Sequence, residues 1–313
     1  MGREMEDGEG KKGGAIVLTP ARMRRMPLPD LDPSGDKDSR GRVLVAGGSA
    51  ENPGGILLAA EAALRAGAGK LQVATVESVA AALGAAIPEA RVFGLAASGG
   101  DGVSPKAAAR IAECAERVDA LLLGPGLIDE EAAGRLAASV LKRVRDIAVV
   151  LDAGALAALR EDRGALAHLG GRAVLTPHGG EMAQLLEMER EEVEADPEAA
   201  ARRAAEAFGA VVALKGADTV IVAPDGAVYR YERGGPGLGT SGSGDVLAGI
   251  ATGLLARGAD PATAAAWAVH LHGEAGNALA KRHGPVGFLA RELPGEIPAI
   301  MRRLSPAPPR STS

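Results

Sequence analysis

Short runs of consecutive hydrophobic residues alternate along the chain with longer segments whose hydrophobic residues recur every three or four positions. A short apolar run is typical of a strand buried on both faces, and the three-to-four spacing is typical of a helix. Strands that alternate with helices predict a mostly parallel central sheet flanked by helices on both faces, an α/β fold. The predicted strands are RVLVAGG (42–48), KLQVAT (70–75), DALLLGPG (119–126), IAVVLDAG (147–154), RAVLTPH (172–178) and VVALKG (211–216).

Three further elements are predicted toward the C-terminus. TVIVAPDGAVYRYE (219–232) is typical of a hairpin that turns at residues 224–226. The hydrophobic residues after Asp245 have helical spacing, and Gly258 is expected to end that helix. Asp260 and the proline after it are typical of the start of another helix, rich in alanine, which we expect to end near Gly284.

The composition of the two ends differs from that of the middle. Residues 1–38 are polar, glycine-rich or interrupted by proline, and we expect them to form a mobile N-terminal arm. The last residues, SPAPPRSTS (305–313), are typical of a disordered tail. Between them, residues 39–304 show no internal repeat and are predicted to form a single domain.

Nearly every predicted parallel strand ends in glycine, proline or a polar residue. In open α/β sheets, ligands bind outside the carboxyl ends of the strands. Each segment alone is explained by turn chemistry, but their shared position predicts that they line one cleft. The segments are Gly47-Gly48-Ser49, Gly124-Pro125-Gly126, Asp152-Ala153-Gly154, Thr176-Pro177-His178-Gly179 and Lys215-Gly216.

A second kind of signal is the stretch GLGTSGSGDVLAG (237–249), where glycines directly precede Asp245 and an apolar helix. The free amides and the dipole at a helix N-terminus favour an anion, and glycines let the backbone approach it closely. Such a site suits phosphoryl transfer, in which amides stabilise the moving phosphate and the carboxylate takes the proton of the attacking hydroxyl. The alternative is that Asp245 is only the N-cap of the helix.

The overall composition excludes several classes of protein. The net charge of −5 and the aromatic content of 2% argue against a nucleic-acid surface. Cys114 is the only cysteine, so an intrachain disulfide and a cysteine-based zinc site are excluded. The sequence contains neither a membrane-spanning run nor an apolar signal core, and we therefore expect a cytoplasmic protein.

Taken together, the motifs resemble those of the ADP-dependent NAD(P)H-hydrate dehydratases of the ribokinase-like superfamily. The order VAGGSAENPGG, ALRAGAGKLQVAT, LLLGPGL, VVLDAGAL, LTPHGGE, ALKGADTVI and GTSGSGDVLAGI carries the resemblance, which spans residues 40–295. It implies a ribokinase-like fold and an enzyme that repairs damaged nicotinamide cofactors. Such an enzyme phosphorylates the hydroxyl of the S form of NAD(P)H hydrate and then releases phosphate, AMP and NAD(P)H.

The resemblance also implies roles for individual residues. Asp245 would be the general base and would contact the hydrate, while the transferred phosphate would be held by the amides of Gly242, Ser243 and Gly244. Further contacts to the hydrate would come from Gly126, His178 and, through the backbone of GGI (54–56), Ile56. The nucleotide would be contacted by Gly244 and by Lys215, Gly216, Ala217, Asp218 and Thr219.

The resemblance implies cofactors and partners as well. Mg²⁺ would act with ADP, which is the phosphoryl donor, and no metal ligands are assigned among the residues. The family often forms tetramers, so we expect a homotetramer. We expect a separate epimerase to convert the R hydrate, because no stretch before residue 40 is long enough to hold an epimerase domain.

Structural alternatives stay open for several residues. Lys215 ends an apolar strand, so its side chain could extend to solvent. Glu181 could serve the first turn of a helix, and Asp152 could cap one. His270 and His272 lie within a predicted helix, where packing or an interface role is favoured.

Two other functions are compatible with a similar cleft. One is a ribokinase-like kinase acting on a hydroxyethylthiazole-type, pyridoxal-type or sugar substrate. The other is a non-catalytic nucleotide sensor, which would bind ADP without turnover. The combination of GPG, TPHGGE and GSGD favours the dehydratase over both.

Overall fold

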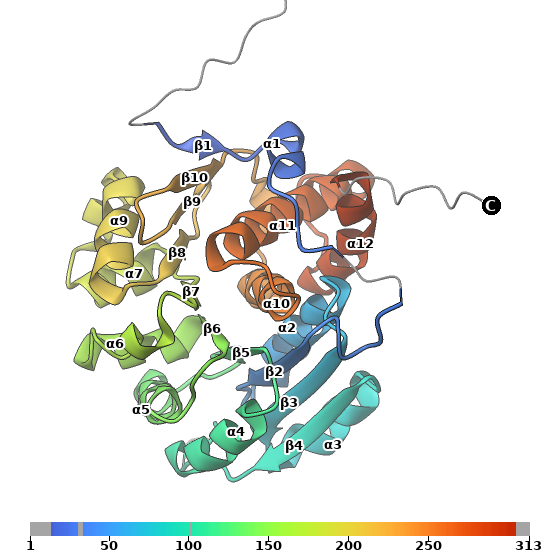
Figure 1. Cartoon of the computed structure of the whole chain (residues 1–313), viewed down its shortest axis with the longest axis vertical. Coiled ribbons are helices and arrows are strands. Elements are labelled where there is room, and N and C mark those ends of the chain that lie inside the picture. The colour runs from blue at the N-terminus through green and yellow to red at the C-terminus, as the bar shows by residue number, and fades with distance from the viewer. Residues whose placement is uncertain (1–13, 31–33, 100–101, 305–313) are drawn as a thin grey trace, which may run out of the picture.

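The computed structural model describes residues 14–30, 34–99 and 102–304 of the 313-residue chain. Ten strands form one sheet in the order β1-β10-β9-β8-β7-β6-β5-β2-β3-β4 (Figure 1). The pairs β10–β9 and β9–β8 are antiparallel, and all other neighbouring pairs are parallel. The strands are β1 (Ile16–Val17), β2 (Arg42–Ala46), β3 (Lys70–Val76), β4 (Ala90–Leu95), β5 (Ala120–Leu123), β6 (Ala148–Leu151), β7 (Ala173–Leu175), β8 (Val211–Leu214), β9 (Thr219–Val222) and β10 (Val228–Tyr231).

Helices cover both faces of the sheet, as the alternating pattern predicts (Figure 1). One face packs against α2, α10, α11 and α12, and the other packs against α4, α5, α7 and α9. The helices are α1 (Pro20–Arg24), α2 (Pro53–Arg65), α3 (Glu77–Ala86), α4 (Ala108–Ala115), α5 (Glu130–Leu141), α6 (Ala158–Glu161), α7 (Gly179–Leu186), α8 (Arg190–Ala195), α9 (Pro197–Phe208), α10 (Ser243–Ala256), α11 (Pro261–His283) and α12 (Leu293–Leu304). Short 3₁₀ helices lie at Pro105–Ala107, Ala153–Ala157, Ala167–Leu169, Pro236–Leu238 and Ala290–Glu292.

The six predicted parallel strands, the hairpin and the two C-terminal helices are confirmed. The Asp260 side chain accepts hydrogen bonds from the second and third residues of α11, which ends at His283, before Gly284. Strand β4 was missed, because its alternating exposed and half-buried residues lack the apolar run that marks the central strands.

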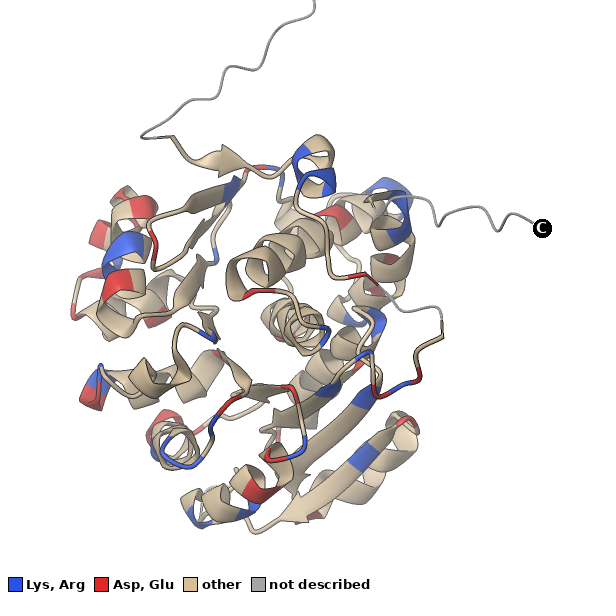
Figure 2. Ribbon diagram, in the orientation of Figure 1, with Lys and Arg blue, Asp and Glu red and all other residues tan. Residues whose placement is uncertain are grey.

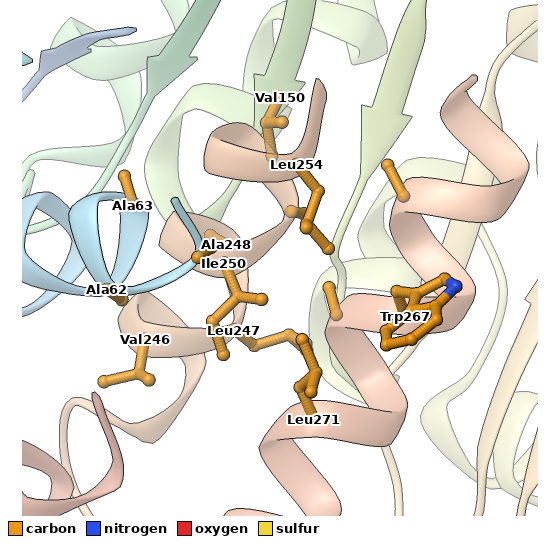
Figure 3. Close-up of a cluster of buried hydrophobic side chains, with 14 of the residues drawn as sticks. Ala62, Ala63, Val150, Val246, Leu247, Ala248, Ile250, Leu254, Trp267 and Leu271 are labelled. Atoms are coloured by element: carbon orange, nitrogen blue, oxygen red, sulfur yellow. The ribbon is translucent and has the colours of Figure 1, made fainter. Parts of the chain in front are cut away.

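Helix α10 lies at the centre of the molecule, between α2 and α11 (Figure 3). Its side chains Val246, Ile250 and Leu254 are completely buried. A methyl group at Gly249 would overlap the carbonyl oxygen of Ala59, and one at Gly253 would overlap that of Ala63. Glycine therefore brings α10 and α2 into backbone contact.

The prediction of a mobile arm is wrong for residues 14–30. Strand β1 pairs with β10, and Leu18 and Met23 are completely buried. The indole Nε1 of Trp267 donates a hydrogen bond to the Met26 carbonyl over 2.6 Å, which ties this segment to α11. Residues 1–13 and the predicted tail at 305–313 lie outside the described residues.

No helix within residues 14–30, 34–99 and 102–304 is both long enough and apolar enough to cross a membrane. Acidic and basic side chains are interspersed over the outer helices and loops, while the centre of the molecule carries few charges (Figure 2).

Candidate active site

The site begins where α10 meets the ends of β5 and β8. A methyl group at Gly55, in the first turn of α2, would lie 2.8 Å from the Gly126 nitrogen and 3.2 Å from Asp245 Oδ1. One at Gly244 would lie 3.3 Å from Lys215 Nζ. Four segments that are far apart in the sequence therefore converge on the Asp245 carboxylate. The convergence predicted from the strand ends is confirmed for the GPG and KG segments.

The first turn of α10 corrects the interpretation of Asp245 as an N-cap. The N-cap is Gly242, whose φ of 87° is left-handed, and Asp245 is the third residue of the helix. The Ser243 amide donates to the Thr240 carbonyl over 3.2 Å, so this amide closes a turn and does not face an open anion site. The next two amides, of Gly244 and Asp245, have no backbone acceptor within the helix, as in the first turn of any helix, and the Asp245 amide donates to its own carboxylate. These two amides can donate hydrogen bonds to the oxygen atoms of a phosphate.

A buried ion pair lies beside these amides. Lys215 Nζ donates to Asp152 Oδ1 over 2.9 Å, and the Thr176 hydroxyl donates to the same oxygen over 2.7 Å. Asp152 makes no capping bond, and its side chain is almost completely buried. The alternatives in which Asp152 caps a helix and Lys215 extends to solvent are therefore wrong. Both charges are held at the base of the site.

The charges in the site perturb one another. Burial disfavours the charged form of Asp245, and repulsion from Asp152 adds to this effect, so the pKa of Asp245 rises to about 7 even though Lys215 opposes the shift. Burial disfavours the ammonium of Lys215, but attraction to Asp152 and Glu181 outweighs burial and raises the pKa of Lys215. At neutral pH the site therefore combines a permanent cation with a carboxylate that can take up or release a proton.

His178 and Glu181 form the N-terminal cap of α7. The Nδ1 atom of His178 accepts hydrogen bonds from the amides of Gly180 and Glu181, and Glu181 Oε2 accepts one from the His178 amide over 2.8 Å. The first-turn role considered for Glu181 is confirmed. The same carboxylate oxygen lies 3.8 Å from Lys215 Nζ, so it also contributes to the charge of the site. The remaining edge of the His178 ring is exposed.

His272 is part of the site, although the sequence pattern favoured a packing role. Its Nε2 atom lies 2.8 Å from Ser243 Oγ, within hydrogen-bonding distance. His270, two residues earlier on α11, packs edge-on against Tyr231 at a centroid distance of 5.7 Å, and its packing role is confirmed. Helical periodicity alone could not separate the two, because neither lies next to a glycine-rich or strand-end motif.

Two hollows of about 730 Å³ each open on either side of residues 215–217. The α10 hollow lies against α10 and α11, and the α8 hollow lies against α7 and α8. Both volumes fall within the range of small-molecule sites. The α10 hollow has mainly apolar walls, Tyr231, Leu238, Leu247 and Val269, and a polar side made by Lys215, Thr219, Ser243, Gly244 and His272. The α8 hollow is lined by Arg190, Val193, Glu194, Pro197, Leu214 and Asp218, and both hollows share His178, Lys215, Gly216 and Ala217.

The other predicted site residues lie outside the two hollows. Gly126 has a left-handed φ of 73°, and a methyl group there would lie 2.6 Å from the Asn52 carbonyl oxygen, so only glycine fits. Ile56 is completely buried, so its side chain is not available to a ligand in this structure. Gly242 lines neither hollow but supplies the left-handed turn before α10.

The described residues contain no group of three or more His, Cys, Asp or Glu side chains arranged to hold a metal ion. After Asp152, which is hydrogen-bonded to Lys215, the described carboxylate nearest to the Lys215 ammonium is that of Glu181, 3.8 Å away.

Comparison with solved structures places the fold. The structure is similar to a ribokinase-like superfamily protein from Enterococcus faecalis, with a TM-score of 0.81, 27% identity, and coverage of 95% of this chain and 99% of the other. It is also similar to the ADP/ATP-dependent NAD(P)H-hydrate dehydratase from Bacillus subtilis co-crystallised with ATP/Mg²⁺, with a TM-score of 0.77, 31% identity, and coverage of 93% and 99%. The predicted ribokinase-like α/β fold is confirmed.

Comparison of sequences identifies the family. The chain is 50% identical over 291 residues to the ADP-dependent (S)-NAD(P)H-hydrate dehydratase of Xanthomonas campestris pv. campestris, covering 92% of this chain and 96% of that protein. The sequence model of the NAD(P)H-hydrate dehydratases matches residues 43–299, which include every element from β2 to the start of α12. The chain belongs to the NAD(P)H-hydrate dehydratase family.

Proposed function

We propose that this protein is an ADP-dependent (S)-NAD(P)H-hydrate dehydratase, which converts the S form of NAD(P)H hydrate to NAD(P)H and releases AMP and phosphate. The observation that carries the proposal is the Asp245 carboxylate, with its pKa raised to about 7, beside the first-turn amides of α10 and the backbone of Gly55 and Gly126. A general base is most effective when its pKa lies near the working pH.

The first step transfers the β-phosphoryl group of ADP to the hydroxyl of the hydrated ring. Asp245 accepts the hydroxyl proton, the hydroxyl oxygen bonds to phosphorus, and the bond from phosphorus to the bridging oxygen breaks, so that AMP leaves with the electron pair. The amides of Gly244 and Asp245 stabilise the negative charge that is spread over the moving phosphate. The Lys215 ammonium, 3.3 Å from where a side chain at Gly244 would begin, adds a fixed positive charge to the same region.

The second step restores the double bond of the ring. The carbon–oxygen bond of the phosphate ester breaks, phosphate leaves with the electron pair, and the departing phosphate takes up the proton that the neighbouring ring carbon loses. The helix N-terminus and Lys215 stabilise the departing phosphate in the same way as the incoming one.

The nucleotide fits the α10 hollow. The hollow's apolar walls, Leu238, Leu247 and Val269, suit an adenine ring, and its polar side leads to Gly244 and Lys215. Thr219 at the start of β9 lies on the wall of this hollow, while Asp218 faces the α8 hollow. The hydrate is proposed to approach Asp245 from the side of Gly55 and Gly126, where backbone without side chains lies close to the carboxylate.

Mg²⁺ is proposed to act with the nucleotide. Mg²⁺ is usually held by substrate phosphates together with one or two carboxylates, and the oxygen donors of the site fit this pattern. Glu181 is the carboxylate suited to such a contact, because Asp152 is already bonded to Lys215 and Thr176. When bound, the ion would neutralise charge on the phosphates.

Three further properties are proposed on the family resemblance. The protein acts in the cytoplasm, it assembles as a homotetramer, and a separate epimerase converts the R hydrate to the S form that this site accepts. Size-exclusion chromatography with light scattering tests the assembly. Incubation of the R hydrate with and without an added epimerase tests the dependence on the S form.

The experiment that tests the function is incubation of purified protein with NADH hydrate, ADP and Mg²⁺. We expect the absorbance of reduced nicotinamide to return, with one AMP and one phosphate formed for each NADH. A phosphorylated hydrate that accumulates without NADH would indicate a kinase. Binding of ADP without any product would indicate a nucleotide sensor. Asp245→Asn is the matched control, because it keeps the size and hydrogen-bonding geometry of the side chain but cannot accept the proton.

A further inference from the structure

We propose that His272 is a positioning residue for this reaction: its imidazole holds Ser243, and through Ser243 it sets the direction of the amides and carboxylate in the first turn of α10. The inference rests on the proposed function, which supplies the reaction in which these groups act. Within the part of the chain that the structure describes, the His272 side chain forms no hydrogen bond to Asp245 or to the Gly244 amide, and its side-chain partner is the Ser243 hydroxyl, 2.8 Å away.

Ser243 is the residue through which the turn can be anchored. It is preceded by Gly242, in the left-handed conformation, and followed by Gly244, so the neighbouring backbone has little stiffness of its own. The Ser243 amide is bonded to Thr240 within the turn, and the Ser243 hydroxyl is bonded to His272 on another helix. The side chain is almost completely buried, so water does not compete freely for this contact. The hydroxyl is therefore the side-chain link between the glycine-rich turn and α11.

The position of His272 is itself fixed by its neighbours on α11. Leu271 is completely buried in the core beside α10 (Figure 3). Gly273 lies directly against the ring of Tyr231, where any side chain would overlap the ring, and the Tyr231 hydroxyl donates to Glu274 over 2.9 Å. Contacts on both sides thus prevent α11 from rotating or sliding. Groups held in this way by a surrounding shell can position an active site within the tolerance that catalysis requires.

The imidazole is neutral in this environment. Burial lowers the pKa of His272 to about 4, and the nearby positive charge of Lys215 acts in the same direction, while a hydrogen bond with the backbone of Ser243 opposes both. A neutral imidazole and a hydroxyl form a single hydrogen bond in which one group donates and the other accepts. At neutral pH His272 therefore adds no charge to the site, and its contribution is geometric.

A competing explanation is that His272 only forms a wall of the α10 hollow, which it lines together with Thr219, Leu247 and Val269. The two roles predict different kinetics. A wall residue affects binding of the nucleotide, so its loss raises the KM for ADP. A residue that aims the amides and the carboxylate affects the transition state, so its loss lowers kcat.

The test compares His272→Ala, His272→Gln, His272→Asn, Ser243→Ala and the Ser243→Ala/His272→Ala double variant in the NADH hydrate assay. Loss of a supporting hydrogen bond typically costs about 10- to 100-fold in activity. We expect His272→Ala and Ser243→Ala each to lower kcat by about this factor, with the KM for ADP changed by less than about twofold. The double variant should be no slower than the slower single variant, because both remove the same contact. The amide of glutamine lies near the position of the histidine Nε2, whereas that of asparagine lies near Nδ1. Relative to His272→Ala, His272→Gln should therefore recover part of kcat, and His272→Asn should not.

His270→Asn is the control for a purely structural effect, because His270 is buried on the same helix but contacts Tyr231 and not Ser243. We expect it to change the melting temperature while kcat for each folded molecule stays at the wild-type value. The inference is overturned if His272→Ala raises the KM for ADP at unchanged kcat, or if the effects of the two single variants multiply in the double variant. A wild-type protein that yields no NADH would instead refute the proposed function. Normal turnover in every His272 variant would refute this inference alone.

Discussion

The replacement of Asp245 by asparagine should make the protein more stable and much less active, and the gain in stability should depend on pH. The pKa of Asp245 rises from 3.8 to about 7 because burial and Asp152 disfavour its charge. Between these two values the folded protein binds the proton more tightly than the unfolded chain does. The stabilising contribution of protonated Asp245 to the free energy of unfolding is therefore fully present below about pH 4. It is lost as the pH rises through 7.

The size of the effect follows from the pKa change. One pKa unit corresponds to about 1.4 kcal/mol, so a rise of about three costs the wild-type protein up to about 4 kcal/mol once Asp245 is ionised. Asparagine has nearly the same shape and carries no charge at any pH. We expect Asp245→Asn to exceed the wild type in free energy of unfolding by up to about 4 kcal/mol at pH 9 and by almost nothing at pH 4. Turnover should fall by at least about a hundredfold, because the amide cannot act as a general base.

The assay is urea unfolding of both proteins at pH 4, 7 and 9, together with turnover at saturating substrates. Glu116→Gln is the control for removal of a negative charge, because Glu116 is exposed at the end of α4 and forms no ion pair with any residue that the structure describes. Its stability should stay within about 0.5 kcal/mol of the wild type at each pH. An Asp245→Asn protein whose advantage does not grow between pH 4 and pH 9 would refute the reasoning from burial. A fully active one would refute the assignment of Asp245 as the base.

Three other predictions follow from the same geometry. Asp152→Asn removes a carboxylate that, together with burial, raises the pKa of Asp245. The midpoint on the acid side of the pH profile of kcat/KM should therefore move from about 7 to lower pH. A midpoint that does not move would mean that another group controls it. Thr219→Trp should narrow the α10 hollow, so the KM for ADP should rise while kcat at saturating ADP is largely kept. A loss of kcat equal to the loss of kcat/KM would contradict a binding role for Thr219. Gly55→Ala should place a methyl group 2.8 Å from the Gly126 nitrogen and 3.2 Å from Asp245 Oδ1, so the backbone beside Asp245 must shift. We expect kcat/KM for the hydrate to fall by about a hundredfold, because a misplacement of about 1 Å can cost that much. Wild-type kinetics would show that the hydrate does not approach from this side.

Much of the fold could be predicted because strands and helices have local periods. The six apolar runs form β2, β3, β5, β6, β7 and β8. The rule that ligands bind at strand ends predicted that Gly126 and Lys215 lie at one site, and both lie beside α10. The prediction failed where local composition and tertiary contacts disagree. The composition of residues 14–30 is typical of a polar arm, yet Leu18 and Met23 are buried against other parts of the chain.

The site could be predicted less completely, since its chemistry depends on which distant side chains meet. The GSGD motif identified Asp245, but placing it as the third residue of α10, not at the cap, required the left-handed conformation of Gly242. Asp152 and Lys215 are 63 positions apart in the chain, and nothing in either local sequence indicates that they form an ion pair. His272 carries no motif at all, and only its contact with Ser243 reveals it.

By itself, therefore, the sequence determined the order of the strands and helices, the glycine-rich start of a helix, and the presence of an acidic residue there. Each of these is encoded within a few neighbouring residues by hydrophobic period and backbone freedom. Only the tertiary structure decided the pKa of Asp245, the cation that faces it and the residue that anchors its turn. Desolvation and charge interactions depend on distance in space, and segments that lie far apart along the chain supply them.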